Sequence, residues 1–158
     1  MHEIKINLGS GHEYKEGYIN VDDGSIFDAK RDVTADLFTY DREPESVDEI
    51  LLSHIVMYIR PEELKPLLKR WYGWLKKGGR IIIETSDINK AMKIALGSSK
   101  SEEWGMINIF GTPETGPHRW GWSPAALTVE IYHAGFRDLK YSKGDKKPER
   151  DYKLTATK

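Results

Sequence analysis

The stretch Ile6-Asn7-Leu8-Gly9-Ser10-Gly11, followed by Gly17-Tyr18-Ile19-Asn20-Val21-Asp22, decides the fold. Each half contains a short apolar run typical of a β-strand; the first run breaks at glycines and the second ends at an acid. The ten residues from Gly9 to Tyr18 span roughly 33 Å when extended, so a parallel crossover is feasible only as a loop or a single turn. An antiparallel pairing of the two strands is the alternative that this spacing leaves open.

The rest of the chain switches between strand-like and helix-like patterns. Five further segments have the pattern of strands: 32–37, 47–53, 80–85, 136–141 and 152–156. The nearly continuous isoleucines of 80–85 are typical of a strand buried on both faces. Helices are predicted at Pro61–Lys77, stopped by Gly78-Gly79, at Asp87–Gly97 and at Ser123–Gly135. This alternation predicts an α/β fold and one domain over residues 1–158.

Composition excludes several classes of protein. The chain has 158 residues, 24 lysines and arginines against 25 acids, and a net charge of −1, whereas a dedicated nucleic-acid binder is expected to be strongly basic. No apolar run approaches the roughly 20 residues of a membrane span, and the amino terminus has no signal-peptide core, so we expect a cytoplasmic protein. The absence of cysteine excludes disulfides and Cys-ligated metals. A folded chain of this mass is expected to expose roughly 8,100 Å².

Residues that could bind a ligand lie at the carboxyl ends of the first two predicted strands. Gly9 and Gly11 allow a ligand to approach the backbone closely. The Asp22 carboxylate, at the end of the neighbouring strand, is suited to accept both hydroxyls of a ribose. The dinucleotide pattern Gly-x-Gly-x-x-Gly is not met, because Tyr14 stands at the third glycine position. We therefore predict a nucleoside-binding corner, with an ordinary tight turn as the alternative.

These residues resemble the opening of the class I S-adenosylmethionine-dependent methyltransferases. The particular resemblance is to a bacterial subgroup with a shortened first crossover, often predicted to act on sugar or cell-surface precursors. Further motifs follow in the family's order over most of the chain: Ala35-Asp36-Leu37, Ser46-Val47-Asp48-Glu49-Ile50, Ser53-His54-Ile55, Leu75-Lys76-Lys77-Gly78-Gly79-Arg80, His118-Arg119-Trp120-Gly121-Trp122 and Ala134-Gly135-Phe136. The resemblance implies a single Rossmann-like domain. Its sheet would be mostly parallel and twisted, with an antiparallel carboxyl-terminal hairpin and helices on both faces.

The resemblance also implies S-adenosylmethionine as the cofactor and S-adenosylhomocysteine as the product. Gly9 and Gly11 would lie against the methionine part, Asp22 would hold the ribose hydroxyls, and Asp36 would accept from the adenine amino group. The implied cofactor-binding residues are Leu8, Gly9, Ser10, Gly11, Asp22, Asp36, Leu37, Ser53 and His54.

The acceptor side of the predicted site draws on two segments. His54, just past the fourth strand, and His118, in the loop 111–121, are the candidate catalytic bases, because a histidine titrates near neutral pH. The candidate substrate-binding residues are Tyr58, His118, Arg119 and Trp120. The subgroup usually has a Glu-His pair where Met57-Tyr58 stand here, so we predict no metal site. The implied acceptor is a small molecule, with no nucleic acid or membrane involved.

Three alternatives accompany this interpretation. The missing Glu-His pair favours a non-catalytic module that binds the cofactor, its product or another nucleoside. A dinucleotide-binding oxidoreductase is a further reading, against which the absent third glycine weighs. The first predicted strand begins at residue 4, without the amino-terminal helices that often cover the acceptor in this family. We therefore expect a pocket that is open or is closed by a partner subunit in a homodimer.

Overall fold

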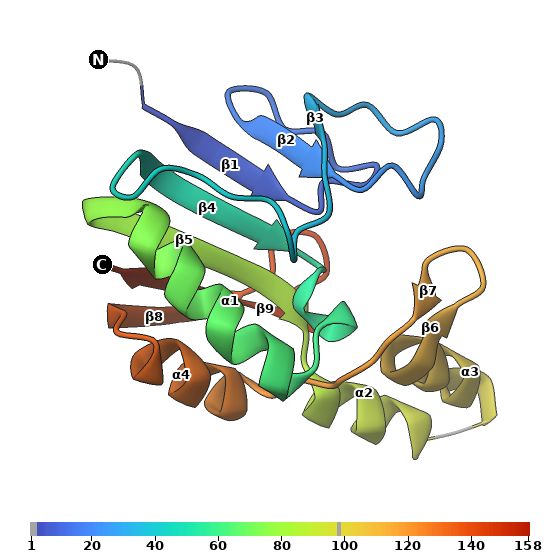
Figure 1. The fold of residues 1–158 in the computed structure, drawn as a ribbon. Coiled ribbons are helices and arrows are strands. Elements are labelled where there is room, and N and C mark those ends of the chain that lie inside the picture. The colour runs from blue at the N-terminus through green and yellow to red at the C-terminus, as the bar shows by residue number, and fades with distance from the viewer. Residues whose placement is uncertain (1–2, 98) are drawn as a thin grey trace.

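A seven-stranded sheet runs through the computed structural model, which describes residues 3–97 and 99–158 (Figure 1). The strand order is β3-β2-β1-β4-β5-β9-β8, and every pair is parallel except those involving β9. The strands are β1 (Lys5–Leu8), β2 (Ile19–Asp22), β3 (Val33–Thr34), β4 (Val47–Ser53), β5 (Leu75–Ser86), β8 (Arg137–Lys143) and β9 (Asp151–Thr157). The predicted α/β fold, with its antiparallel carboxyl-terminal hairpin, is confirmed.

The link between β1 and β2 is a loop, and the two strands are parallel. Ile6 pairs with Ile19 and Leu8 pairs with Val21, so the antiparallel alternative does not hold. No helix interrupts residues 9–18. The carboxyl ends of β1, β2, β4 and β5 therefore meet at one edge of the sheet, where open α/β sheets bind their ligands.

Two helices pack on one face of the sheet. They are α1 (Pro61–Trp74) and α4 (Pro124–His133). The Ser123 hydroxyl caps α4 by accepting from the Ala126 amide at 3.2 Å. The helix α1 ends at Trp74 and does not continue to Gly78-Gly79 as predicted, because Leu75 is already extended and pairs with Val47 in the sheet.

The apolar core lies between these helices and the strands. Its fully buried members alternate along each strand and recur at helical spacing along the helices. They include Ile6, Leu8, Ile50, Leu52, Ile81 and Ile83 from the strands and Leu64, Leu68, Trp71 and Leu127 from the helices. Burying one such side chain contributes about 1.5–3 kcal/mol, so this single layer supplies most of the driving force for folding.

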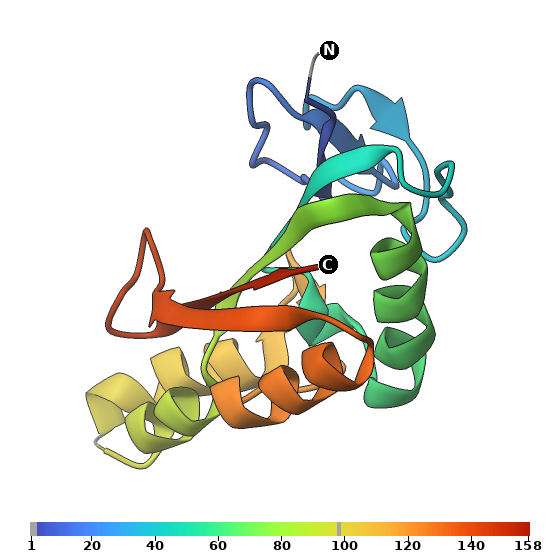
Figure 2. The same ribbon diagram turned by 90° about the vertical axis from the view of Figure 1, so that its left-hand side faces the viewer.

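None of the described helices covers the opposite face of the central strands, and this corrects the expectation of helices on both faces (Figure 2). Its side chains are mostly polar: Lys5, Asn7, Glu49, Ser53, Arg80, Glu84, Lys153 and Thr155, with Leu51 and Ile82 between them. Arg80 is exposed and Ile82 only half-buried, so β5 is not buried on both faces as predicted. The molecule exposes 9065 Å², more than the roughly 8,100 Å² expected for its mass, as a missing helical layer would require.

Loops take the place of helices on this polar face. Residues 9–18 fold back over β1 and β2, where the Asn7 side chain donates to the Glu13 carbonyl and to Asn20 Oδ1. The loop between β8 and β9 folds over β5, where Glu84 accepts from the Asp145 amide at 2.9 Å. An ion pair between Lys146 and Glu13 joins the two loops. A groove of about 390 Å³ lies beneath them.

The remaining elements extend beyond the carboxyl end of β5 (Figure 1). They are α2 (Ile88–Ala95), α3 (Ser99–Phe110) and the short ladder of β6 (Gly111–Thr112) with β7 (Gly116–Pro117); a single turn, η1 (Val56–Tyr58), follows β4. Sequence patterning predicted α2 but not α3, because the apolar residues of α3 do not form one stripe. Three of them, Trp104, Met106 and Phe110, are exposed. A Cβ at Gly105 would lie 2.3 Å from the Ala95 amide nitrogen, so close approach of the two helices requires glycine there. None of the described helices is long and apolar enough to cross a membrane.

Candidate functional site

The first part of the site is the corner where the chain turns at Gly9 and Gly11 beside Asp22. The Gly9 amide donates to the Val21 carbonyl at 2.8 Å and so fixes the turn against β2. The Asp22 carboxylate accepts from the Gly11 amide at 2.8 Å and from the Gly24 amide at 3.1 Å. Each carboxylate oxygen keeps a lone pair for a further donor, such as a hydroxyl of a bound sugar.

The two glycines of this corner differ in what surrounds them. Both have a left-handed backbone, with φ of 68° at Gly9 and 45° at Gly11. A Cβ at Gly9 would lie 2.3 Å from Ile55 Cδ1, whereas one at Gly11 would have Ile26, at 3.5 Å, as its nearest contact within the described part of the chain. Gly9 is therefore required by packing against Ile55, and Gly11 has the more open side, toward which a ligand can approach.

Gly9→Ala is expected to destabilise the fold more than Gly17→Ala. Both positions have positive φ, which costs an alanine about 1–2 kcal/mol, but a Cβ at Gly17 has no neighbour within 4 Å. The alanine at position 9 must in addition displace Ile55. Thermal unfolding of both variants measures the difference; an equal loss of stability would contradict the packing argument.

The second part of the site is a cleft of about 450 Å³ at the carboxyl ends of β4 and β5. Its lining includes aromatic and apolar side chains as well as polar and charged ones. Its lining residues include Ser53, His54, Met57, Tyr58, Ser86, Trp104, Asn108, His118, Arg150 and Asp151. Gly9, Gly11 and Asp22 line neither this cleft nor the groove on the polar face, but His54 and Ile55 follow β4, the strand next to β1.

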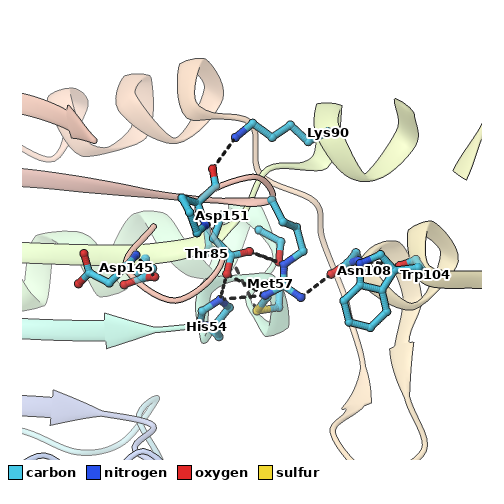
Figure 3. Close-up of polar contacts among 12 residues, drawn as sticks. His54, Met57, Thr85, Lys90, Trp104, Asn108, Asp145 and Asp151 are labelled. Carbon is cyan, nitrogen blue, oxygen red and sulfur yellow. Dashed lines mark hydrogen bonds and ion pairs between the residues drawn. The ribbon is translucent and has the colours of Figure 1, made fainter. Parts of the chain in front are cut away.

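His54 lies at the centre of the polar network (Figure 3). Its backbone is left-handed, with φ of 55°, a conformation that costs about 1–3 kcal/mol outside glycine and is concentrated at functional sites. Its amide donates to the Glu84 carbonyl at 2.8 Å. Its Nε2 lies 2.9 Å from Asp151 Oδ2, and its side chain is 30% exposed. The ring is thus held by the protein on one side and open to the cleft on the other.

Asp151 is the fully buried acid that holds His54. It also accepts from the Ser86 hydroxyl at 3.0 Å and from two nitrogens of the Arg150 guanidinium. Burial alone would raise the pKa of the Asp151 carboxyl, but the hydrogen bonds from His54 and Arg150, together with their charges, outweigh burial and hold that pKa well below its usual range. Asp151 is therefore ionised at neutral pH.

The depressed pKa of Asp151 gives stability a defined dependence on pH. The unfolded chain binds a proton at Asp151 before the folded chain does, so the stabilisation is complete above about pH 5 and is lost progressively below roughly pH 4. We expect Asp151→Asn to flatten the acid limb of the free energy of unfolding by up to about 1.4 kcal/mol per pH unit. Denaturant unfolding between about pH 3 and pH 6 measures this slope. An unaltered slope in Asp151→Asn would contradict the assignment.

Comparison with solved structures identifies the fold that this site belongs to. An S-adenosylmethionine-dependent methyltransferase from Archaeoglobus fulgidus has 21% identity and a TM-score of 0.72, over 99% of this chain and 86% of that one. A methyltransferase from Thermotoga maritima, described as a possible histamine N-methyltransferase, has 18% identity and a TM-score of 0.65, over 98% and 81%. The chain has the class I S-adenosylmethionine-dependent methyltransferase fold. Phosphoethanolamine N-methyltransferase 2 of Haemonchus contortus, in complex with S-adenosylmethionine, matches 99% of this chain with 48% of its own length, at 13% identity and a TM-score of 0.62. No family model and no curated protein matches the sequence.

The methyltransferase fold brings the expected acceptor residues together only in part. Tyr58 and His118 line the cleft and contact each other edge to face, with ring centroids 5.2 Å apart. Burial lowers the pKa of the His118 imidazole, and its Nδ1 lies 3.2 Å from the Asn108 carbonyl. Arg119 instead pairs with Glu63 at 2.8 Å. Trp120, whose ring lies beside Trp122, does not line the cleft either.

The expected cofactor residues are placed in several environments. Leu8 is fully buried in the core, and Ser10 is 2% exposed, with a hydroxyl that has no hydrogen-bond partner among the described residues. Asp36 is exposed, and its carboxylate accepts from the Phe38 amide at 2.7 Å. Leu37 packs against the core cluster. Ser53 lines both the cleft and the groove on the polar face.

Sequence reasoning missed the partners of His54. Asp151 and Arg150 lie between the predicted strands 136–141 and 152–156, and Asn108, which contacts Arg150, lies on the helix that was not predicted. One signal was available: β9 is antiparallel to β5, so its first residue lies at the edge where the parallel strands end. Among the described residues, no three histidine or acidic side chains gather as a metal site would require.

Proposed function

We propose that this chain transfers the methyl group of S-adenosylmethionine to a small-molecule acceptor bound in the His54 cleft. The observation that carries the proposal is the His54–Asp151 pair, buried on one side and open on the other, at the carboxyl edge of a methyltransferase-fold sheet. A left-handed histidine backbone and a buried acid with a strongly shifted pKa are features that concentrate at functional sites. We further propose that residues 1–158 form one cytoplasmic domain.

The corner at Gly11 and Asp22 suits the cofactor. The Asp22 carboxylate is 8% exposed and retains acceptor capacity for two ribose hydroxyls. The open side of Gly11 admits the adenosyl group without a Cβ in its way. We assign the adenine amino group to Asp36, with Leu37 beside it, and the transferring end to Ser53 and His54.

The chain's own contribution to the reaction is placement and proton removal. The cofactor, when bound, supplies an already activated methyl group. Orienting two reactants in line contributes about 7–11 kcal/mol to lowering the barrier. His54 takes the proton of an acceptor hydroxyl or ammonium group, a role worth about 10²–10⁴-fold in rate. Tyr58, Trp104 and His118 supply the wall against which the acceptor packs, and a sugar or cell-surface precursor would present hydroxyls of the kind required.

Calorimetric titration with S-adenosylhomocysteine tests cofactor binding. Incubation with methyl-labelled S-adenosylmethionine and the small-molecule fraction of a cell extract then tests transfer and identifies the labelled acceptor by mass spectrometry. We expect binding and a labelled small molecule. Binding without any labelled product would favour the non-catalytic module, and absence of binding would overturn the proposal.

A further inference from the structure

We propose that Asp151 is a positioning residue that fixes the neutral His54 ring with its proton on Nε2, which makes Nδ1 the basic atom of the site. The inference rests on the proposed function for its catalytic meaning, but the protonated nitrogen is a property of the folded chain alone. It assigns to Asp151 a role that the resemblance does not supply.

The hydrogen-bonding capacity of Asp151 is fully used. Oδ1 accepts from the Ser86 hydroxyl at 3.0 Å and from Arg150 Nε. Oδ2 accepts from Arg150 at 2.7 Å and lies 2.9 Å from His54 Nε2. An ionised carboxylate only accepts. A lone pair on Nε2 would therefore face a carboxylate lone pair at 2.9 Å, whereas an N–H there completes the fourth hydrogen bond.

The competing arrangement would have Nε2 accept from Arg150. The nearest guanidinium nitrogen of Arg150 is 3.5 Å from Nε2, too long to offset the repulsion from Asp151 at 2.9 Å. That guanidinium is already shared between Asp151 and the Asn108 side chain, which it contacts at 2.8 Å. The geometry therefore selects the Nε2–H form.

This choice leaves Nδ1 with its lone pair on the reactive side. The Ser53 hydroxyl lies 3.3 Å from Nδ1, and Ser53 lines the cleft. Asp151 is wholly buried, so the 30% of the His54 side chain that is exposed lies away from Asp151. An acceptor hydroxyl or ammonium group in the cleft would transfer its proton to Nδ1, directly or through the Ser53 hydroxyl, and its freed electron pair would form the new bond to the methyl carbon as the carbon–sulfur bond breaks.

Ring nitrogen NMR on ¹⁵N-histidine-labelled protein tests the assignment without cofactor or acceptor. Spectra are recorded at about pH 8.5, above the ordinary histidine pKa. Comparison with His54→Asn identifies the His54 signals among the five histidines. We expect a protonated Nε2 and an unprotonated Nδ1. A protonated Nδ1, alone or together with Nε2, would overturn the proposal.

The Asp151→Asn variant provides a second test of the assignment. Its amide oxygen is expected to stay with Arg150 and Ser86, which turns its N–H toward Nε2 and moves the ring proton to Nδ1. Methyl transfer should then fall about 10²–10⁴-fold, with S-adenosylhomocysteine affinity unchanged. Asp145→Asn should alter neither the spectrum nor the rate. An unchanged His54 spectrum in Asp151→Asn would overturn the inference, whereas a wild-type protein that has the expected spectrum but transfers no methyl group would overturn only the proposed function.

Discussion

Asp22→Ala is expected to weaken binding of S-adenosylhomocysteine by at least about 100-fold. The substitution removes a buried carboxylate that would accept from two ribose hydroxyls, and each hydrogen bond to a charged group is worth about 1.5–3 kcal/mol. It also frees the amides of Gly11 and Gly24, which the carboxylate now holds. Calorimetric titration measures the loss, and circular dichroism establishes that the variant is folded.

Two further variants sharpen this result. Asp22→Asn keeps one acceptor oxygen and should bind more tightly than Asp22→Ala, yet more weakly than the wild type. Asp28→Ala changes an exposed acid of the loop between β2 and β3, and should leave affinity within about twofold. A folded Asp22→Ala protein with wild-type affinity would remove the ribose role.

His54→Asn is expected to lower methyl transfer by about 10²–10⁴-fold and leave cofactor affinity within a few fold. Asparagine tolerates the left-handed backbone at this position better than most residues, so the loss would report the missing imidazole rather than backbone strain. The rate of transfer to the acceptor found in the extract measures the effect. His133→Gln, at the carboxyl end of α4, is the matched control.

The pH dependence of the His54→Asn variant distinguishes the acceptor classes. An amine acceptor loses its proton to solvent as pH rises, so the defect should shrink at high pH. A hydroxyl acceptor keeps its proton over the accessible range, so the defect should persist. Wild-type transfer rates in His54→Asn at every pH would exclude His54 as the base.

The sequence predicted the sheet well because its signals are local. Alternation in Ile6–Leu8, the break at Gly9 and the acid at Asp22 all lie within a few residues of the elements they define. The capping residue Ser123 and the glycine Gly135 bounded α4 for the same reason. The turn at Gly9 and Gly11 beside Asp22 lies where these local signals predict it, and its role in binding a nucleoside stays a prediction.

What could not be predicted depends on contacts between distant segments. The His54–Asp151 pair joins residues 97 positions apart, and its acid lies in a segment whose composition indicates only a loop. The helix α3 has no single apolar stripe, and its packing depends on Gly105 against Ala95. The isoleucine run of β5 predicted a strand buried on both faces, whereas one face of the sheet is polar. Arg80, which is exposed, and Glu84, which is buried, lie on that polar face.

The polar, helix-free face of the sheet has a consequence for how this fold tolerates change. The protein has two layers, one of strands and one of helices, that pack through a single apolar interface, and loops lie at the carboxyl ends of the strands. Helices on the far side are therefore dispensable for keeping His54 and Asp22 in place. A protein with this fold can therefore lose the helices on that face and become smaller while its apolar core stays filled.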